Sequence, residues 1–139
     1  MIKTLLDRVR VNLDVAKYSL SQDDECHLDE AEYQVQQAVE KLLKEYISRA
    51  GVTPRKTHDI SVLYREALGL GLKLPPALDR EMLLYAATLT DAEAANRYAS
   101  SYLNIRSSVE AELQFAENLF EFLFPSCHKG NDVHQMKLD

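Results

Sequence analysis

Arg97 is the side chain of this sequence best suited to holding a phosphate group. Its guanidinium stays charged and offers forked N–H donors whose spacing matches phosphate oxygens. No Asp or Glu occurs between Glu93 and Glu110, so the stretch around Arg97 is free of carboxylates. The alternative role is an ion pair on the surface or at an interface, which is common for arginine.

His58 is the second candidate, because imidazole titrates near physiological pH and can transfer protons. It lies in the sequence Thr57-His58-Asp59, directly after the basic pair Arg55 and Lys56. We predict that Thr57 caps a helix and that Asp59 complements the helix dipole in the first turn. A histidine at such a position also serves simply to hydrogen-bond nearby backbone, and this alternative stays open.

Apolar residues at steps of three and four predict the helices that must position these side chains. The predicted helices cover residues 2–20, 28–50, 57–69, 75–90 and 107–124, with Gly51, Pro54 and Pro125 as the clearest breaks. No segment alternates with a period of two. We therefore expect an all-α fold, an up-down bundle of four to five helices over residues 1–124, followed by a mobile C-terminal tail over 125–139.

Strict up-down alternation would gather basic residues at one end of the bundle. The net charge of −6 argues against binding nucleic acid by bulk electrostatics, so a basic site has to be local. Alternation would place the 51–57 loop and the 91–106 connection at the same end, and the acidic 21–27 loop at the other. The predicted phosphate-binding residues are Arg97, Arg55, Lys56 and Arg106. Chance sorting of surface charge is the alternative.

The stretch from Gln36 to Asp59, QQAVEKLLKEYISRAGVTPRKTHD, resembles the HEPN domain, the nucleotide-binding domain of higher eukaryotes and prokaryotes. Asp7 to Lys17 is similar to the first helix of that family, and Arg97-Tyr98 stands where the family carries its functional arginine. The resemblance covers residues 1–124 and implies a HEPN-like helical bundle.

In ribonuclease members of the family, this arginine is followed after a few residues by a histidine, and two copies face each other across a dimer. The resemblance implies that the arginine orients the phosphate and the histidine assists proton transfer without a metal. Tyr102 occupies the histidine position here. Its ordinary pKa near 10 makes it a poor substitute for imidazole, although it can still hydrogen-bond a phosphate or stack on a base. The alternative is that Tyr98 and Tyr102 pack into the bundle or a dimer seam. The predicted catalytic residues are therefore Arg97, Tyr102 and His58.

Three functions follow from these residues and the resemblance. The favoured one is a homodimer that binds nucleotide or RNA phosphate, works with a nucleotidyltransferase partner and lacks full ribonuclease activity. The second is a metal-independent endoribonuclease, the toxin of a toxin–antitoxin pair. The third is a purely structural helical dimerisation module.

We predict no metal and no cofactor. The chain has no Glu-x-x-His, and the adjacent pairs Cys26-His27 and Cys127-His128 are poorly shaped for a tetrahedral ion. No apolar run approaches the roughly 20 residues of a membrane span, and no signal peptide is evident, so we expect no membrane contact and a cytoplasmic location.

Overall fold

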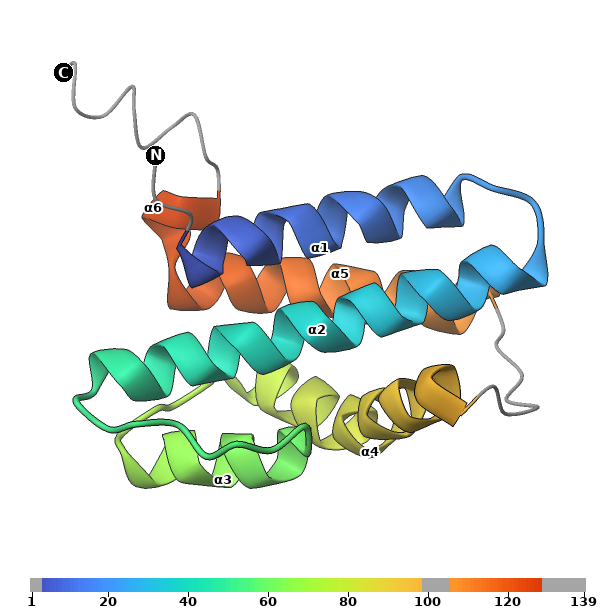
Figure 1. Ribbon diagram of the computed structural model, residues 1–139. Helices are drawn as coiled ribbons and strands as arrows, with labels where there is room; N and C mark the ends of the chain where they lie inside the picture. Colours follow the sequence, from blue (N-terminus) through green and yellow to red (C-terminus); the bar gives the residue numbers. More distant parts are fainter. Residues whose placement is uncertain (1–3, 99–105, 129–139) are drawn as a thin grey trace, which may run out of the picture.

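Helices make up the fold, as the sequence periodicity predicts (Figure 1). The structure, a computed structural model, describes residues 4–98 and 106–128, with only the backbone described for residues 91–98 and 128. No strand occurs in these ranges. The helices are α1 (Leu5–Leu20), α2 (Glu25–Arg49), α3 (Ile60–Gly69), α4 (Pro76–Tyr98), α5 (Arg106–Leu123) and α6 (Pro125–His128).

Helices α1 and α2 form an antiparallel hairpin along the length of the molecule (Figure 1). Thr4 and Asp7 form a capping box at the start of α1, and the Asp24 side chain caps α2 by accepting from the backbone N–H of His27. Gly51 follows α2 with a φ of +89°, a conformation in which glycine avoids the strain of a side chain.

Helix α3 runs in the same direction as α2, because the chain between them turns back instead of ending in a short loop (Figure 1). His58 lies beside Glu40, which is about 13.5 Å along α2 from Arg49, the last residue of that helix. The prediction that Thr57 caps this helix is wrong. The Asp59 side chain accepts from the N–H groups of Ser61 and Val62 and caps α3. Thr57 instead accepts from the N–H of Asp59.

This return path changes which ends of the bundle meet. Helix α4 lies antiparallel to α3, with the N–H of Ile60 donating to Thr90 and the Tyr64 hydroxyl donating to Asp79. Helix α5 therefore begins at the same end of the bundle as the turn between α1 and α2 (Figure 1). The expected grouping of the 91–106 connection with the 51–57 loop is wrong, because strict alternation assumes a short loop between α2 and α3.

The core is organised around α2, which contacts α1, α3, α4 and α5. Its inward residues meet apolar stripes from all four helices. The largest fully buried apolar side chains are Phe115, Phe120, Leu42, Leu43, Ile47, Ile60, Leu63, Met82, Leu89 and Leu119. Among the residues that the structure describes, no helix is both long and apolar enough to cross a bilayer.

Helix α6 covers the first residues of the segment 125–139, which we predicted to be a mobile tail. The Arg10 guanidinium donates to the Cys127 carbonyl at 2.7 Å, and the Arg49 guanidinium lies over the Phe124 ring, 4.6 Å from its centroid. These contacts attach residues 124–127 to the first turns of α1 and the last turn of α2. The rest of the expected tail, residues 129–139, lies outside the described residues.

Candidate functional site

Only part of the predicted catalytic set falls on described side chains. Arg97 belongs to the last turn of α4 by its backbone, and its side chain is not among those described. Tyr102 lies outside the described residues. The pairing of Arg97 with Tyr102 thus stays a prediction, and His58 is the member of the set that can be followed in space.

Arg106 lies apart from Arg55 and Lys56, two of the other predicted phosphate ligands. Its guanidinium donates to the carbonyl of Leu20 and, at 2.7 Å, to the carbonyl of Gln22. These acceptors belong to the turn between α1 and α2, whereas Arg55 and Lys56 are exposed in the segment that follows α2. The structure therefore does not bring Arg106 together with Arg55 and Lys56, and Arg106 serves to fix the start of α5.

His58 forms a polar cluster with α2. Its Nδ1 lies 3.0 Å from Oε1 of Glu40, and because a carboxylate only accepts, Nδ1 carries the proton. Gln36 donates to the same oxygen at 2.9 Å, and Lys44 donates to Oε2 at 2.8 Å. The Glu40 carboxylate thus has three donors around it.

The spacing of the α2 residues explains this cluster. Gln36, Glu40 and Lys44 follow one another at steps of four and so lie on one stripe of the helix. Glu40 and Lys44 form an i, i+4 pair of the kind that is usual on a solvated helix face, but the Glu40 side chain is only 7% exposed. The segment that returns along α2 places His58 over this stripe. The sequence of α2 alone does not indicate that the stripe is covered.

Burial and hydrogen bonding act in opposite directions on Glu40. Burial disfavours its charged form, but hydrogen bonds from Lys44, His58 and Gln36 outweigh this effect and lower the pKa of the carboxyl below its ordinary value. Glu40 is therefore ionised at neutral pH and holds Lys44 and His58 in place. The imidazole remains half exposed, with 53% of the side chain accessible.

A second lysine, Lys41, lies next to this cluster. Its Nζ donates to Asn12 of α1 at 2.9 Å and to Gln37 at 3.3 Å. Burial lowers the pKa of Lys41, and the positive charges of Arg8 and Lys44 lower it further, although Glu40 opposes them. Arg8, Lys41 and Lys44 are therefore close enough to act on one another in an otherwise acidic protein.

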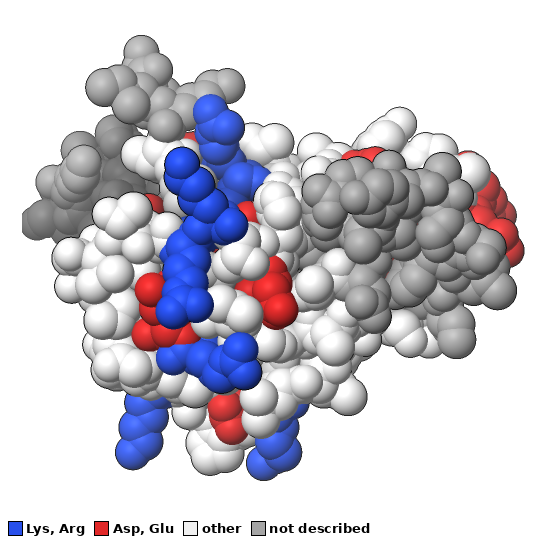
Figure 2. Space-filling view, turned by 60° about the horizontal axis from the view of Figure 1, so that its bottom comes forward, with Lys and Arg blue, Asp and Glu red and all other residues white. Residues whose placement is uncertain are grey.

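We call Arg8, Lys41, Lys44 and His58 the α2 basic surface. Figure 2 shows Lys and Arg side chains gathered in a line across one face of the molecule. Arg8 is exposed and has no ion pair among the residues that the structure describes. Chemically, this surface can bind an anion, and the His58–Glu40 pair resembles the arrangement by which a carboxylate orients an imidazole for proton transfer.

A second polar pair, which sequence reasoning missed, lies inside the bundle. Glu32 of α2 and Glu112 of α5 are 1% and 2% exposed, and they share a hydrogen bond. Burial, together with the hydrogen bond and charge of Glu32, raises the pKa of Glu112 to about 10. Each glutamate also has one buried carboxyl oxygen without a hydrogen-bond partner. The sequence did contain one indication of this pair: Glu112 occupies an inward position in the stripe from Val109 to Ala116.

Within the described ranges, no group of three His, Cys, Asp or Glu residues is arranged to hold a metal ion. Cys26 begins α2, whereas Cys127 lies beside Arg10 near the start of α1, so the two adjacent Cys-His pairs belong to opposite ends of the hairpin.

The family model described as the HEPN domain matches residues 2–127, which is most of the chain. No curated protein and no solved structure matches the chain.

Proposed function

The chain belongs to the HEPN domain family, and from this premise we propose that it binds the phosphates of a nucleotide or of RNA on the α2 basic surface. The family supports a role connected with nucleotides or RNA in general. The surface supplies what phosphate recognition requires, namely several cations within reach of one anion.

The observation that carries this proposal is the proximity of Arg8, Lys41 and Lys44 on one face of the molecule. The positive charges of Arg8 and Lys44 repel that of Lys41 and add to burial in lowering its pKa, while Glu40 acts against them. A bound phosphate would relieve the repulsion and accept hydrogen bonds from the exposed guanidinium of Arg8. Arg55 and Lys56, exposed beside His58 in sequence, extend the positive charge for a longer RNA.

We further propose that the protein acts as a homodimer with a nucleotidyltransferase partner, and that Arg97 adds a phosphate contact. Tyr102 at the position of the family's histidine supports reduced ribonuclease activity, since a phenol near pKa 10 transfers protons poorly at neutral pH. A cytoplasmic location fits these roles.

The second candidate function is a metal-independent endoribonuclease of the toxin type, and the His58–Glu40 contact favours it. A carboxylate that accepts from Nδ1 leaves Nε2 as the atom free to take a proton from a ribose hydroxyl. In this case His58 would supply the imidazole that the Arg97 motif lacks.

Binding of fluorescein-labelled single-stranded RNA and of labelled ATP, measured by fluorescence anisotropy at several salt concentrations, tests the leading function. We expect Arg8→Gln/Lys44→Gln to weaken binding and to reduce the slope of log K against log salt by about 0.7 for each phosphate contact removed. Lys73→Gln, an exposed lysine in the segment between α3 and α4, is the matched control. Unchanged binding and slope in a folded double variant would refute the α2 basic surface as the site.

Incubation of an RNA pool in excess EDTA tests the second function. Cleavage that is lost in both His58→Ala and Arg97→Ala would establish the endoribonuclease. Absence of cleavage by the folded wild-type protein would exclude it for that RNA pool and leave the binding function.

A further inference from the structure

His58 lies in the α2 basic surface with one ring nitrogen engaged and the other without a partner in the described part of the chain. Nδ1 donates to Oε1 of Glu40 at 3.0 Å, so a buried and ionised carboxylate holds the ring in place. Nε2 lies on the opposite side of the half-exposed ring. In the neutral ring Nε2 only accepts hydrogen bonds, and it becomes a donor when the ring is protonated. What this nitrogen can bind therefore depends on a proton.

Helices α1 and α2 place cations beside this ring. Lys44 donates to Oε2 of Glu40 at 2.8 Å, so Lys44 and His58 share one carboxylate. Lys41 is the next basic residue of α2, and both Lys44 and Arg8 of α1 are close enough to lower its pKa. An anion that reaches these cations therefore also comes close to His58.

The segment that carries His58 adds no negative charge at the ring. Arg55 and Lys56 are exposed just before it in sequence. The Asp59 carboxylate is used at the start of α3, where it accepts from two backbone N–H groups. From α4, the described neighbour of this segment is the uncharged hydroxyl of Thr90. Glu40, which already has three donors, is thus the carboxylate in contact with the ring.

We propose that His58 takes up a proton when a terminal phosphate binds on the α2 basic surface, and that this surface therefore favours phosphate monoesters over internal RNA diesters. The proposal rests on the proposed function and names its class of ligand. A monoester, on a mononucleotide or at an RNA end, carries up to two negative charges near neutral pH, whereas a diester carries one. The greater charge stabilises the protonated ring more strongly. The proton comes from the solvent and adds to Nε2, which then donates to a phosphate oxygen, and no covalent bond of the ligand changes.

His27 shows that a carboxylate partner is not sufficient for such a site. Its Nδ1 lies 2.7 Å from Asp24, and 41% of its side chain is exposed, which is similar to the exposure of His58. Its neighbours in sequence include Asp23 and Glu25, and both are exposed. These carboxylates would repel a phosphate. His27 is therefore a matched control for His58.

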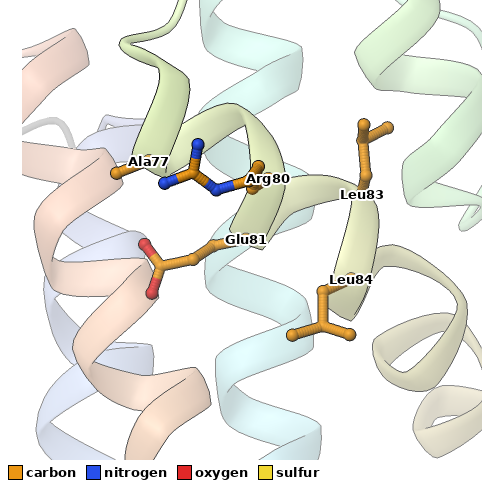
Figure 3. Close-up of a pocket in the computed structure, with 5 residues that line it drawn as sticks. All are labelled: Ala77, Arg80, Glu81, Leu83 and Leu84. Carbon is orange, nitrogen blue, oxygen red and sulfur yellow. The ribbon is translucent and has the colours of Figure 1, made fainter.

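The depression on the outward face of α4 is also less suited to a phosphate. It is lined by Ala77, Arg80, Glu81, Leu83 and Leu84 (Figure 3). Arg80 and Glu81 extend to the same side of the helix in Figure 3, so a phosphate at the guanidinium would also meet the carboxylate. Arg80 is therefore a control for the loss of one exposed cation.

RNA of a single sequence, labelled with fluorescein at its 3′ end, tests the proposal when it is prepared with either a 5′-phosphate or a 5′-hydroxyl. The two RNAs share every internal diester. By fluorescence anisotropy, we expect wild-type protein to bind the 5′-phosphate RNA about tenfold more tightly at neutral pH, the effect of one charge-assisted hydrogen bond. Binding that takes up a proton weakens as the pH rises. The affinity for the 5′-phosphate RNA should therefore fall by up to about tenfold between about pH 7 and about pH 8.

His58→Asn separates proton uptake from hydrogen bonding to Glu40. The asparagine amide can donate to Glu40 as Nδ1 does, but it takes up no proton. This variant should lose most of the preference for the 5′-phosphate RNA and most of the fall in affinity above about pH 7. His27→Asn and Arg80→Gln should keep both. Circular dichroism checks that each variant is folded.

Competition with unlabelled AMP identifies the source of the phosphate. Displacement by AMP, where adenosine has no effect, would assign the site to mononucleotides, and displacement by the 5′-phosphate RNA alone would assign it to RNA ends. Equal affinity of the wild type for the two RNAs would overturn the selection of terminal phosphates and leave phosphate binding intact. An undiminished preference with the same pH dependence in folded His58→Asn would overturn the role of His58. Failure to bind either RNA or AMP would instead overturn the proposed function itself.

Discussion

Replacing Glu112 by glutamine should stabilise the protein, and increasingly so as the pH rises. The pKa of Glu112 is raised to about 10 by burial and by the neighbouring Glu32, so folded molecules keep a proton at neutral pH that unfolded molecules lose. An amide at this position can donate to Glu32 as the protonated carboxyl does, but it has no proton to lose. The variant therefore keeps the geometry and removes the titration.

The magnitude follows from proton linkage. A group whose folded-state pKa is raised stabilises the fold fully below its ordinary pKa, and this contribution is lost as the pH rises toward the folded-state pKa. Between the ordinary value of 4.5 and about 10, the folded state binds up to one more proton than the unfolded state. The free energy of unfolding then falls by up to about 1.4 kcal/mol per pH unit in the wild type relative to Glu112→Gln. Between about pH 6 and about pH 8, the advantage of the variant should grow by up to roughly 2.7 kcal/mol.

Urea unfolding followed by circular dichroism at these two pH values measures the effect. All other ionisable groups are the same in both proteins, so their contribution cancels in the comparison. Glu110→Gln, at an exposed glutamate of the same helix, is the control and should follow the wild type. Parallel pH dependence of wild type and Glu112→Gln would show that no extra proton is held between Glu32 and Glu112, and the reasoning would fail.

Three further predictions concern residues that position the candidate site and α5. Glu40→Ala should lower the free energy of unfolding by about 3 kcal/mol at neutral pH, because it leaves Lys44 and Gln36 without their acceptor. Since the pKa of Glu40 is lowered in the folded state, this loss should shrink as the pH falls below the ordinary pKa of a glutamate. Thermal denaturation at several pH values measures both effects. Asp59→Ala should cost about 1 kcal/mol in urea unfolding through loss of the α3 cap, with Thr57→Ala costing less. Arg106→Ala should cost about 2 kcal/mol by removing both carbonyl contacts and should leave RNA affinity unchanged; a matching loss of affinity would return it to the phosphate ligands.

The periodicity of apolar residues was sufficient for the helices and the fold class, because a three- and four-residue repeat is a local property of the chain. The stripe from Leu6 through Val9, Leu13 and Ala16 is buried as expected. The direction of α3 was not predictable in this way. It depends on whether the segment around Pro54 ends in a short loop or runs back along α2, and both paths suit the same residues.

The candidate site was predictable only in part for the same reason. His58 was identified from its residue type and neighbours, whereas nothing in the sequence of α2 indicates that Glu40 is buried, because its partner His58 comes from outside α2. Nothing in the sequence of α2 distinguishes Lys41 from an ordinary surface lysine. Its hydrogen bond to Asn12 of α1 does so only in the structure. Contacts between segments far apart in sequence decide these environments, and a helical repeat carries no information about them.

The central place of α2 also bears on how the protein is made. A ribosome completes the α1–α2 hairpin well before α5, and until then the face of α2 that will meet α5 is open to water. That face includes Glu32, a side chain that water solvates well, among apolar neighbours such as Leu28 and Val35. A carboxylate at this position makes the unfinished hairpin less prone to associate with other nascent chains, and the arrival of Glu112 on α5 covers it once synthesis is complete.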